Sequence, residues 1–269
     1  MNDAVHRVAQ RLTGSDVLAI NRYPGGDISG ASEVRLADGR VLVAKHGPVV
    51  DIEGRMLQAM SASSAPVPDV LGCEDDVLLI ECLPDDGPLS REAWSALARA
   101  LTSLQEITGD TYGWAEDYAL RHVTVANANS REWPSFWAEN RLLCHAAHLD
   151  GATGKRLEAL SSKLKDILPD KPRPALLHGD MWGGNVLVSS NRISGLIDPC
   201  AYHGHAEVDV ATLTVFDSPT PEFFEAMQLE TGWQERQPVY RLWTWLLHVR
   251  LFGNGYLPAV ERELASLGF

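Results

Sequence analysis

One short segment in the second half of the chain carries the side chains best suited to chemistry. It runs from His178 to Asn185, reads HGDMWGGN, and is followed by Asp198 in the tripeptide IDP. Asp180 and Asn185 have the H-x-D-x-x-x-x-N spacing of a kinase catalytic loop, and Asp198 takes the place of the later metal-binding aspartate. Phosphoryl transfer needs a carboxylate that orients the acceptor hydroxyl and takes its proton, together with oxygen ligands that hold Mg²⁺ against nucleotide phosphates. Asp180 fits the first role, and Asn185 and Asp198 fit the second.

These three residues also have an ordinary structural explanation. Aspartate and asparagine are common in turns, where their side chains bond to nearby backbone groups. Any one of them alone would favour that explanation. All three in this order, between short apolar runs that predict strands, favour phosphoryl transfer instead.

The N-terminal part supplies a candidate phosphate-binding lysine. Lys45 ends an apolar run over residues 41–45 that predicts a strand, and Glu53 follows in a segment with helical spacing. A lysine at this place could reach the α- and β-phosphates of ATP, with Glu53 as its partner. Residues 24–30 (PGGDISG) lie where a loop over the phosphates belongs, although they lack strict G-x-G-x-x-G spacing. The sequence contains no G-x-x-x-x-G-K-[ST], which argues against a P-loop enzyme.

The elements that must position these residues divide the chain into two parts. Strands are expected over residues 17–22, 32–36, 41–45 and 77–82, with a hairpin turn at Asp38-Gly39 and a helix over residues 50–60. A Pro/Asp/Gly-rich linker begins at Leu83. Beyond it we expect a helix capped by Ser90, helices over residues 136–149, 155–168 and 239–252, and a strand-forming island over residues 175–197. The sequence therefore predicts an α+β fold with a β-rich lobe (residues 1–83) and a mainly helical lobe (residues 84–269).

Composition restricts the class of partner. The 269 residues include 23 Lys+Arg and 36 Asp+Glu, a formal charge of −13, which argues against a general nucleic-acid or anionic-membrane binder. The acidic balance is compatible with a cationic acceptor drawn to a cleft lined by carboxylates.

Four scattered cysteines without a C-x-x-C pair predict neither a disulfide framework nor a cysteine-based zinc site. The first residues lack a secretory apolar core, and the longest apolar stretch is too short to span a bilayer, so we expect a cytoplasmic protein.

Several motifs together resemble the fructosamine (ketosamine) kinase family, which belongs with the aminoglycoside and choline phosphotransferases of protein-kinase-like fold. The specific pointers are Trp182 inside the catalytic loop and Asp-Pro at residues 198–199 in place of D-F-G. Further segments follow the order found in the family: residues 25–29, 53–57, 67–68, 79–83, 112–114, 133–137 with Arg141, and 202–211. The resemblance covers most of the chain, from about Tyr23 to Phe216.

The resemblance implies a two-lobed kinase fold, ATP and Mg²⁺ as cofactors, and a role for each matching residue. Asp180 would be the base, and Asn185 and Asp198 would be the metal ligands. Nucleotide contacts would come from Lys45, Glu53, Gly25, Gly26, Ser29, Glu81 and Leu83. Trp182 and Tyr202 would contact substrate, whereas His178 and Asp209 would brace the loop. The acceptor would be a small or protein-bound ketosamine, so that phosphorylation promotes deglycation, and we expect a monomer.

Departures from the family pattern leave the acceptor open. Residues 117–121 (DYALR) lack the polar residues followed by Ile-Gly that family members commonly carry, Ser29 stands where Asn is frequent, and the tail after Asp217 is short. A kinase for an aminoglycoside, choline, homoserine or a thio-sugar is the rival of the same fold. A pseudokinase is disfavoured because every expected catalytic side chain is present, and a hydrolase lacks a convincing nucleophile. His203 and His205 lack a third ligand at suitable spacing, so zinc is not expected.

Overall fold

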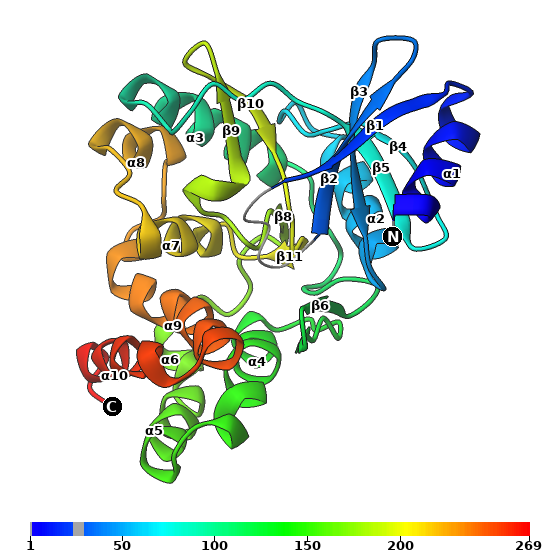
Figure 1. Cartoon of the computed structure of the whole chain (residues 1–269). Helices are drawn as coiled ribbons and strands as arrows, with labels where there is room; N and C mark the ends of the chain where they lie inside the picture. The colour runs from blue at the N-terminus through cyan, green and yellow to red at the C-terminus, as the bar shows by residue number, and fades with distance from the viewer. Residues whose placement is uncertain (1, 24–29) are drawn as a thin grey trace.

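The computed structural model describes residues 2–23 and 30–269, and its N-terminal part is built on an antiparallel sheet (Figure 1). The five strands stand in the order β1-β2-β3-β5-β4. Their bounds are β1 (Val17–Arg22), β2 (Gly30–Leu36), β3 (Val41–His46), β4 (Val70–Glu74) and β5 (Val77–Glu81). Gly25, Gly26 and Ser29, expected to contact nucleotide, lie outside the described residues.

Each face of this sheet is covered by one helix, as the alternation of side chains along a strand requires. On one face, Val77 and Leu79 of β5 pack in a cluster with helix α1 (Asn2–Thr13). On the other, Leu78 and Ile80 pack with helix α2 (Val50–Met60). Val43 of β3 belongs to the α2 side, and Lys45 lies two residues further along the same strand. The pleat therefore directs Lys45 toward α2, which carries Glu53.

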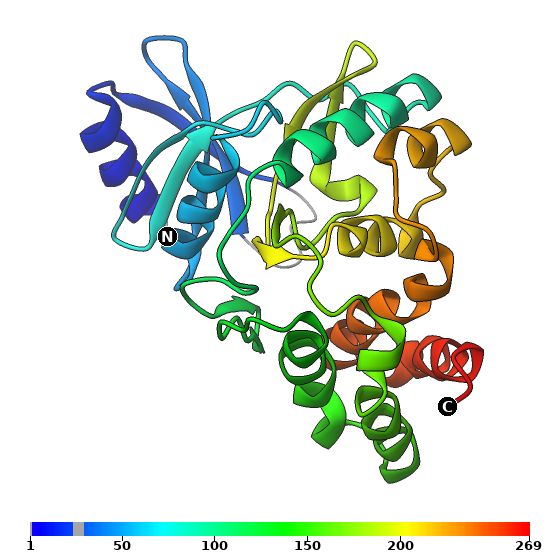
Figure 2. The same cartoon turned by 180° about the vertical axis from the view of Figure 1, so that it is seen from behind.

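The C-terminal part is mainly helical (Figures 1 and 2). Its buried side chains form one large apolar core. The linker after β5 leads to α3 (Arg91–Gln105), whose first turn is capped by the hydroxyl of Ser90, which accepts a hydrogen bond from Ala93 N–H. The remaining helices are α4 (Trp133–Trp137), η1 (Ala138–Leu142), η2 (Leu143–His148), α5 (Gly151–Ser161), α6 (Leu164–Ile167), η3 (Gly183–Asn185), α7 (Glu207–Phe216), α8 (Pro221–Met227), α9 (Trp233–Phe252), η4 (Asn254–Tyr256) and α10 (Leu257–Ser266).

Three two-stranded ladders lie within this helical part. The strands are β6 (Tyr118–Leu120) with β7 (Val123–Val125), β8 (Ala175–Leu177) with β11 (Tyr202–Gly204), and β9 (Val186–Ser189) with β10 (Arg192–Leu196). Residues 178–185 connect β8 to β9, and residues 197–201 connect β10 to β11. Because β8 and β11 pair directly, the two loops that carry the candidate catalytic residues start from a common ladder.

The predicted α+β fold, with a β-rich N-terminal part and a mainly helical C-terminal part, is confirmed, and most expected strands begin or end within two residues of the observed ones. The sequence missed β4, β6, β7 and β11. It also predicted one regular helix over residues 136–149, where the backbone passes through a π-helical turn (η1) into a 3-10 helix (η2). The π turn carries Arg141, which is fully buried with its guanidinium against the rings of Tyr202, Phe136 and Trp243. Within the described ranges, no helix combines the length and hydropathy that a membrane span requires.

Candidate active site

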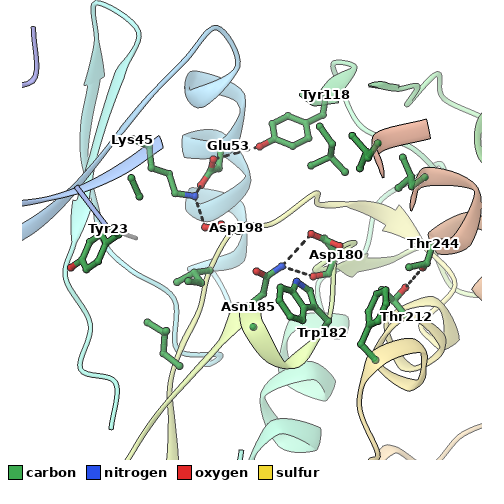
Figure 3. A pocket seen from close by; sticks show the side chains of 18 of the residues that line it. Tyr23, Lys45, Glu53, Tyr118, Asp180, Trp182, Asn185, Asp198, Thr212 and Thr244 are labelled. Carbon is green, nitrogen blue, oxygen red and sulfur yellow. Dashed lines mark hydrogen bonds and ion pairs between the residues drawn. The ribbon is translucent and has the colours of Figure 1, made fainter. Parts of the chain in front are cut away.

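A cavity of about 1010 Å³ lies between the sheet and the helical part (Figure 3). Strands β2, β3 and β5, the linker, the β9–β10 hairpin and helices α7 and α9 all contribute to its walls. Its lining includes Lys45, Glu53, Glu81, Leu83, Tyr118, Asp180, Trp182, Asn185, Asp198, Thr212, Phe216, Thr244, His248, Phe252 and Tyr256. The residues with candidate catalytic roles therefore share one space, although they come from distant parts of the sequence.

Lys45 joins the sheet to the catalytic turns. Its ammonium group forms ion pairs with Glu53 of α2 and with Asp198, and both Lys45 and Glu53 are buried. Burial alone would lower the pKa of Lys45, but the two carboxylates outweigh it and raise that pKa. The lysine is thus held as a cation inside the cavity, which is the state that binds phosphate.

The catalytic loop is fixed by its own side chains. The amide nitrogen of Asn185 donates to the backbone oxygen of Asp180 at 2.7 Å and to the Asp180 carboxylate at 3.2 Å. Because the nitrogen is used within the loop, the oxygen is the atom that Asn185 can offer to a cation. Burial raises the pKa of Asp180 to about 6, even though the hydrogen bond from Asn185 acts in the opposite direction. A carboxylate with a pKa near neutrality is well matched to proton transfer.

His178 and Asp209 hold the loop from behind. Nε2–H of His178 donates to the backbone oxygen of Ile197 at 2.9 Å, and Nδ1 accepts a 3.4 Å contact from Asp180 N–H. The Asp209 carboxylate accepts hydrogen bonds of 2.9 Å from the backbone N–H groups of His178 and Gly179. Burial lowers the pKa of His178 to about 4, so its imidazole is neutral. These contacts are the ones expected of bracing residues, and they fix the loop at Asp180 relative to the turn at Asp198.

The bend before Asp180 requires glycine. Gly179 has φ +81°, and a Cβ there would lie 1.9 Å from the backbone oxygen of Cys200. No side chain fits at that distance, so the close approach of the two catalytic turns depends on this glycine.

The donors at this point fit a magnesium ion. Asp198 adopts φ +55°, a left-handed conformation that aspartate tolerates, and its side chain is 40 % exposed in the cavity. Together, Asp198 and Asn185 supply a carboxylate and an amide oxygen, which are hard ligands. Mg²⁺ typically takes one or two protein ligands and completes its shell with phosphate oxygens and water, so this small donor set is adequate.

Beyond Asp180 the cavity changes character. Figure 3 shows Asp180 between the Lys45–Glu53–Asp198 group and a pair of threonines, Thr212 and Thr244. The two threonine hydroxyls are 3.5 Å apart, and both residues are buried. Past the threonines, the walls are largely aromatic and aliphatic, and they come from α7, α9 and η4.

Of the other described residues expected to contact ligand, three line the cavity and one, Tyr202, does not. Glu81 and Leu83 line the cavity at the linker, and Trp182 lines it with 41 % of its surface exposed. Tyr202 does not fit its expected role as a substrate contact. It is fully buried beneath the guanidinium of Arg141, with 4.1 Å between the guanidinium carbon and the ring centroid, so it supports the core.

The sequence analysis did not identify the cavity residues that come from α7 and α9. Thr212 and Phe216 lie four residues apart on α7, and Thr244, His248 and Phe252 repeat at the same interval on α9, so each set forms one helix face. The helix expected over residues 239–252 is present within α9, but nothing in its apolar sequence indicated that one face opens onto the cavity. The four-residue spacing was a usable signal, but it is shared with ordinary core helices.

Known proteins match the chain over nearly its whole length. A protein of Escherichia coli (strain K12) named a probable ketoamine kinase is 29% identical over 289 residues, a match that covers 99% of both chains. A crystal structure from Thermobifida fusca, assigned as a fructosamine-3-kinase, superposes with a TM-score of 0.90 at 28% identity and covers 98% of both chains. An aminoglycoside phosphotransferase in ternary complex with AMP-PNP and hygromycin B shares the fold, with a TM-score of 0.68 at 18% identity, over 98% of this chain and 97% of that one.

The family assignment rests on a match to a family model as well as on individual relatives. The family model described as fructosamine kinase matches residues 1–267, which is almost the complete sequence. The fructosamine kinases are phosphotransferases, and the cavity brings together the lysine, aspartates and asparagine that such chemistry requires. The chain therefore belongs to the fructosamine kinase family.

Proposed function

We propose that this protein transfers the γ-phosphoryl group of ATP to a sugar hydroxyl of a ketosamine, either free or attached to a protein. The observation that carries the proposal is the convergence of Lys45, Asp180, Asn185 and Asp198 on one cavity. The family model over residues 1–267 and the ketoamine kinase names of relatives support the same acceptor class.

The nucleotide would occupy the end of the cavity beside the sheet. Val43, Ile80, Leu187 and Ile197 form apolar walls there, which suit a planar adenine ring. The backbone of residues 80–83 would provide its polar contacts, although the N–H of Glu81 already donates to the backbone oxygen of Asp69. Lys45 would then bind the phosphates, with Glu53 holding the lysine in place.

Asn185 and Asp198 would hold Mg²⁺ against the phosphates. When bound, the ion would neutralise charge on the transferring group. Asp198 pairs with Lys45, so both groups converge on the region assigned to the phosphates. The loop bonds of Asn185 keep its side chain oriented before any ligand binds.

Asp180 would orient the acceptor hydroxyl and take its proton. Direct in-line transfer is expected, because phosphoryl transfer depends mainly on positioning and charge stabilisation. Trp182, which belongs to the loop over residues 178–185 and is partly exposed in the cavity, would contact the sugar. Thr212 and Thr244 would offer hydroxyl groups to the sugar on the far side of Asp180.

Phosphorylation would serve deglycation. Phosphate is a better leaving group than hydroxide. If the phosphorylated hydroxyl is on a carbon beside the carbonyl, loss of a proton from the amine-bearing carbon and departure of inorganic phosphate would leave an unsaturated adduct that water can hydrolyse. The free amine would then be recovered after hydrolysis. This consequence depends on the identity of the acceptor, which a direct assay can establish.

The test is an acceptor panel with purified protein and Mg-ATP. It contains ketosamines, aminoglycosides and amino alcohols, and ADP formation and phosphorylated product are measured together. The proposal expects equal amounts of ADP and phosphorylated ketosamine. Preferential phosphorylation of an aminoglycoside or amino alcohol would show a kinase of different acceptor class. Stabilisation against heat by Mg-ATP without turnover on any acceptor would show a nucleotide-binding pseudokinase.

A further inference from the structure

The far end of the cavity is formed by one face of each of two helices. From α7 come Thr212 and Phe216, and from α9 come Thr244, His248 and Phe252, each set spaced by four residues. The threonines lie next to Asp180, and the aromatic residues lie one and two helical turns beyond them (Figure 3 shows the threonines). A substrate whose hydroxyl reaches Asp180 would therefore extend along these faces from polar to aromatic surroundings.

The aromatic side chains at this end form one connected group around His248. Its ring centroid lies 4.9 Å from that of Phe216, 5.1 Å from Tyr256 and 5.3 Å from Phe252. Nδ1–H of His248 donates to the backbone oxygen of Thr244, and burial lowers the pKa of the imidazole, so the ring is neutral. We call these four residues the aromatic end.

Aromatic side chains in and near the aromatic end are more exposed than aromatic residues of a protein core. Seven large hydrophobic residues are exposed in the described part of the chain, and Phe216 (44 %), Phe252 (43 %) and Trp182 (41 %) are three of them. All three line this cavity. Apolar surface concentrated in a concave site points to a ligand that covers it.

Charge at the two ends is distributed unequally. The carboxylates among the described lining residues are Glu53, Glu81, Asp85, Asp180 and Asp198. They come from the sheet, helix α2, the linker and the turns at Asp180 and Asp198, whereas α7, α9 and η4 contribute no acidic side chain to the described lining. A second positive charge on the substrate would meet no carboxylate among the described lining residues of α7, α9 and η4.

We propose that the aromatic end selects ketosamines whose amine carries an uncharged apolar group, such as an aromatic ring, over those whose amine carries a second cation. The inference rests on the proposed ketosamine kinase activity. In a ketosamine the amine sits on the sugar carbon next to the carbonyl, only a few bonds from the sugar hydroxyls. When a hydroxyl is bound at Asp180, the group on the amine extends past Thr212 and Thr244 and packs against Phe216 and Phe252. Burial of an apolar group there gains free energy in proportion to its area.

The experiment uses three ketosamines made from one ketose with benzylamine, methylamine or 1,5-diaminopentane. The specificity constant kcat/KM is measured for each with saturating Mg-ATP. We expect the benzylamine adduct to exceed the diaminopentane adduct by roughly tenfold, the range in which apolar pockets discriminate. Phe252→Ala should lower kcat/KM for the benzylamine adduct by roughly tenfold and leave the methylamine adduct within about twofold, since only the former reaches the ring.

Two further variants make the result decisive. Phe216→Leu removes the second ring while it keeps an apolar side chain, and it should give the same selective loss if Phe252→Ala folds poorly. Leu18→Ala changes an exposed apolar residue on β1, 70 % exposed, and should alter none of the three constants. Equal or better use of the diaminopentane adduct, or equal losses with all three adducts in Phe252→Ala and Phe216→Leu, would overturn the inference. Failure to phosphorylate any ketosamine would overturn the proposed function itself, and the inference with it.

Discussion

The two ends of the cavity are built in different ways. Beside the sheet, charged residues such as Lys45 and Asp198 contact each other through ion pairs that only certain side chains can form. Beside α7 and α9, the walls are apolar rings such as Phe216 and Phe252, whose packing many side chains could imitate. The first end is suited to a fixed chemical group, the triphosphate, and the second to a variable part of the acceptor. This difference predicts that substitutions at the first end affect the rate with every acceptor, whereas those at the second affect only the choice of acceptor.

The largest effect is expected from Asp180→Asn. The amide has the same shape and can keep a contact with Asn185, but it cannot take the proton of the acceptor hydroxyl. We expect kcat to fall by on the order of a hundredfold or more, with ATP affinity within about threefold. Steady-state kinetics and calorimetric titration with ATP measure the two quantities. Asp110→Asn, on the exposed surface, is the matched control, and an active Asp180→Asn enzyme would contradict the role of the base.

A smaller but still large effect is expected from Lys45→Met. The change removes the cation shared by Glu53 and Asp198 and leaves a buried carboxylate without its partner. The free energy of unfolding should fall by about 3 kcal/mol, and kcat/KM for ATP should fall by roughly thirtyfold. Denaturant unfolding and ATP kinetics test both values. Arg35→Met, which removes a cation from an exposed ion pair with Glu33, should leave the free energy of unfolding nearly unchanged, because water screens that pair. Equal effects of the two variants would contradict the account of the buried cation.

Thr244 lies between the charged end and the aromatic end of the cavity, and Thr244→Val tests whether its hydroxyl binds the acceptor. Valine keeps the shape of threonine but loses the hydroxyl that faces Thr212 in the cavity. If the hydroxyl binds the sugar, KM for the ketosamine should rise about fivefold, with KM for ATP unchanged. Thr124→Val on the exposed side of β7 serves as the control. A change in KM for ATP, with KM for the ketosamine unchanged, would show that Thr244 contacts the nucleotide and not the acceptor.

The smallest effect on activity is expected at a buried histidine outside the cavity. His205 bonds through Nδ1 with the hydroxyl of Tyr240 at 2.7 Å, and burial lowers its pKa to about 3. In the unfolded chain a histidine has a pKa of about 6.5, so the unfolded state binds the proton first as the pH falls. Stability is therefore lost below pH 6.5, by about 2 kcal/mol between pH 7 and pH 5 for this one group.

His205→Asn should reduce that loss, with little change in kcat at pH 7. Denaturant unfolding at pH 7 and pH 5 compares the variant with the parent. His46→Asn, at an exposed residue of β3, is the matched control. An unchanged pH dependence in His205→Asn would show that this imidazole does not titrate as described.

The polar end was largely predictable from the sequence, and the aromatic end was not. Asp180 and Asn185 are separated by a fixed number of residues because both belong to one loop, and the structure joins them by hydrogen bonds. Lys45 and Glu53 could be paired because a strand followed by a covering helix brings these positions together. In each case the chemistry restricts the residue type, so the spacing alone is informative.

The features that the sequence did not predict depend on contacts between segments that are far apart in the chain. Tyr202 lies in a segment that resembles the family, but Arg141, sixty-one residues earlier in the chain, buries it. Strands of three residues such as β6 and β11 are too short to produce a recognisable alternation. The opening of one face of α9 onto the cavity likewise depends on how α7 packs against it.

The central claim is that Asp180 faces the acceptor hydroxyl while Lys45 holds the phosphates across the same cavity. A crystal structure with a non-hydrolysable ATP analogue, Mg²⁺ and a ketosamine tests it most directly. The account predicts a sugar hydroxyl within hydrogen-bonding distance of the Asp180 carboxylate, and the terminal phosphate on the line from that hydroxyl toward Lys45 and the metal. A sugar bound with its hydroxyls away from Asp180, or phosphates that do not approach Lys45, would contradict it.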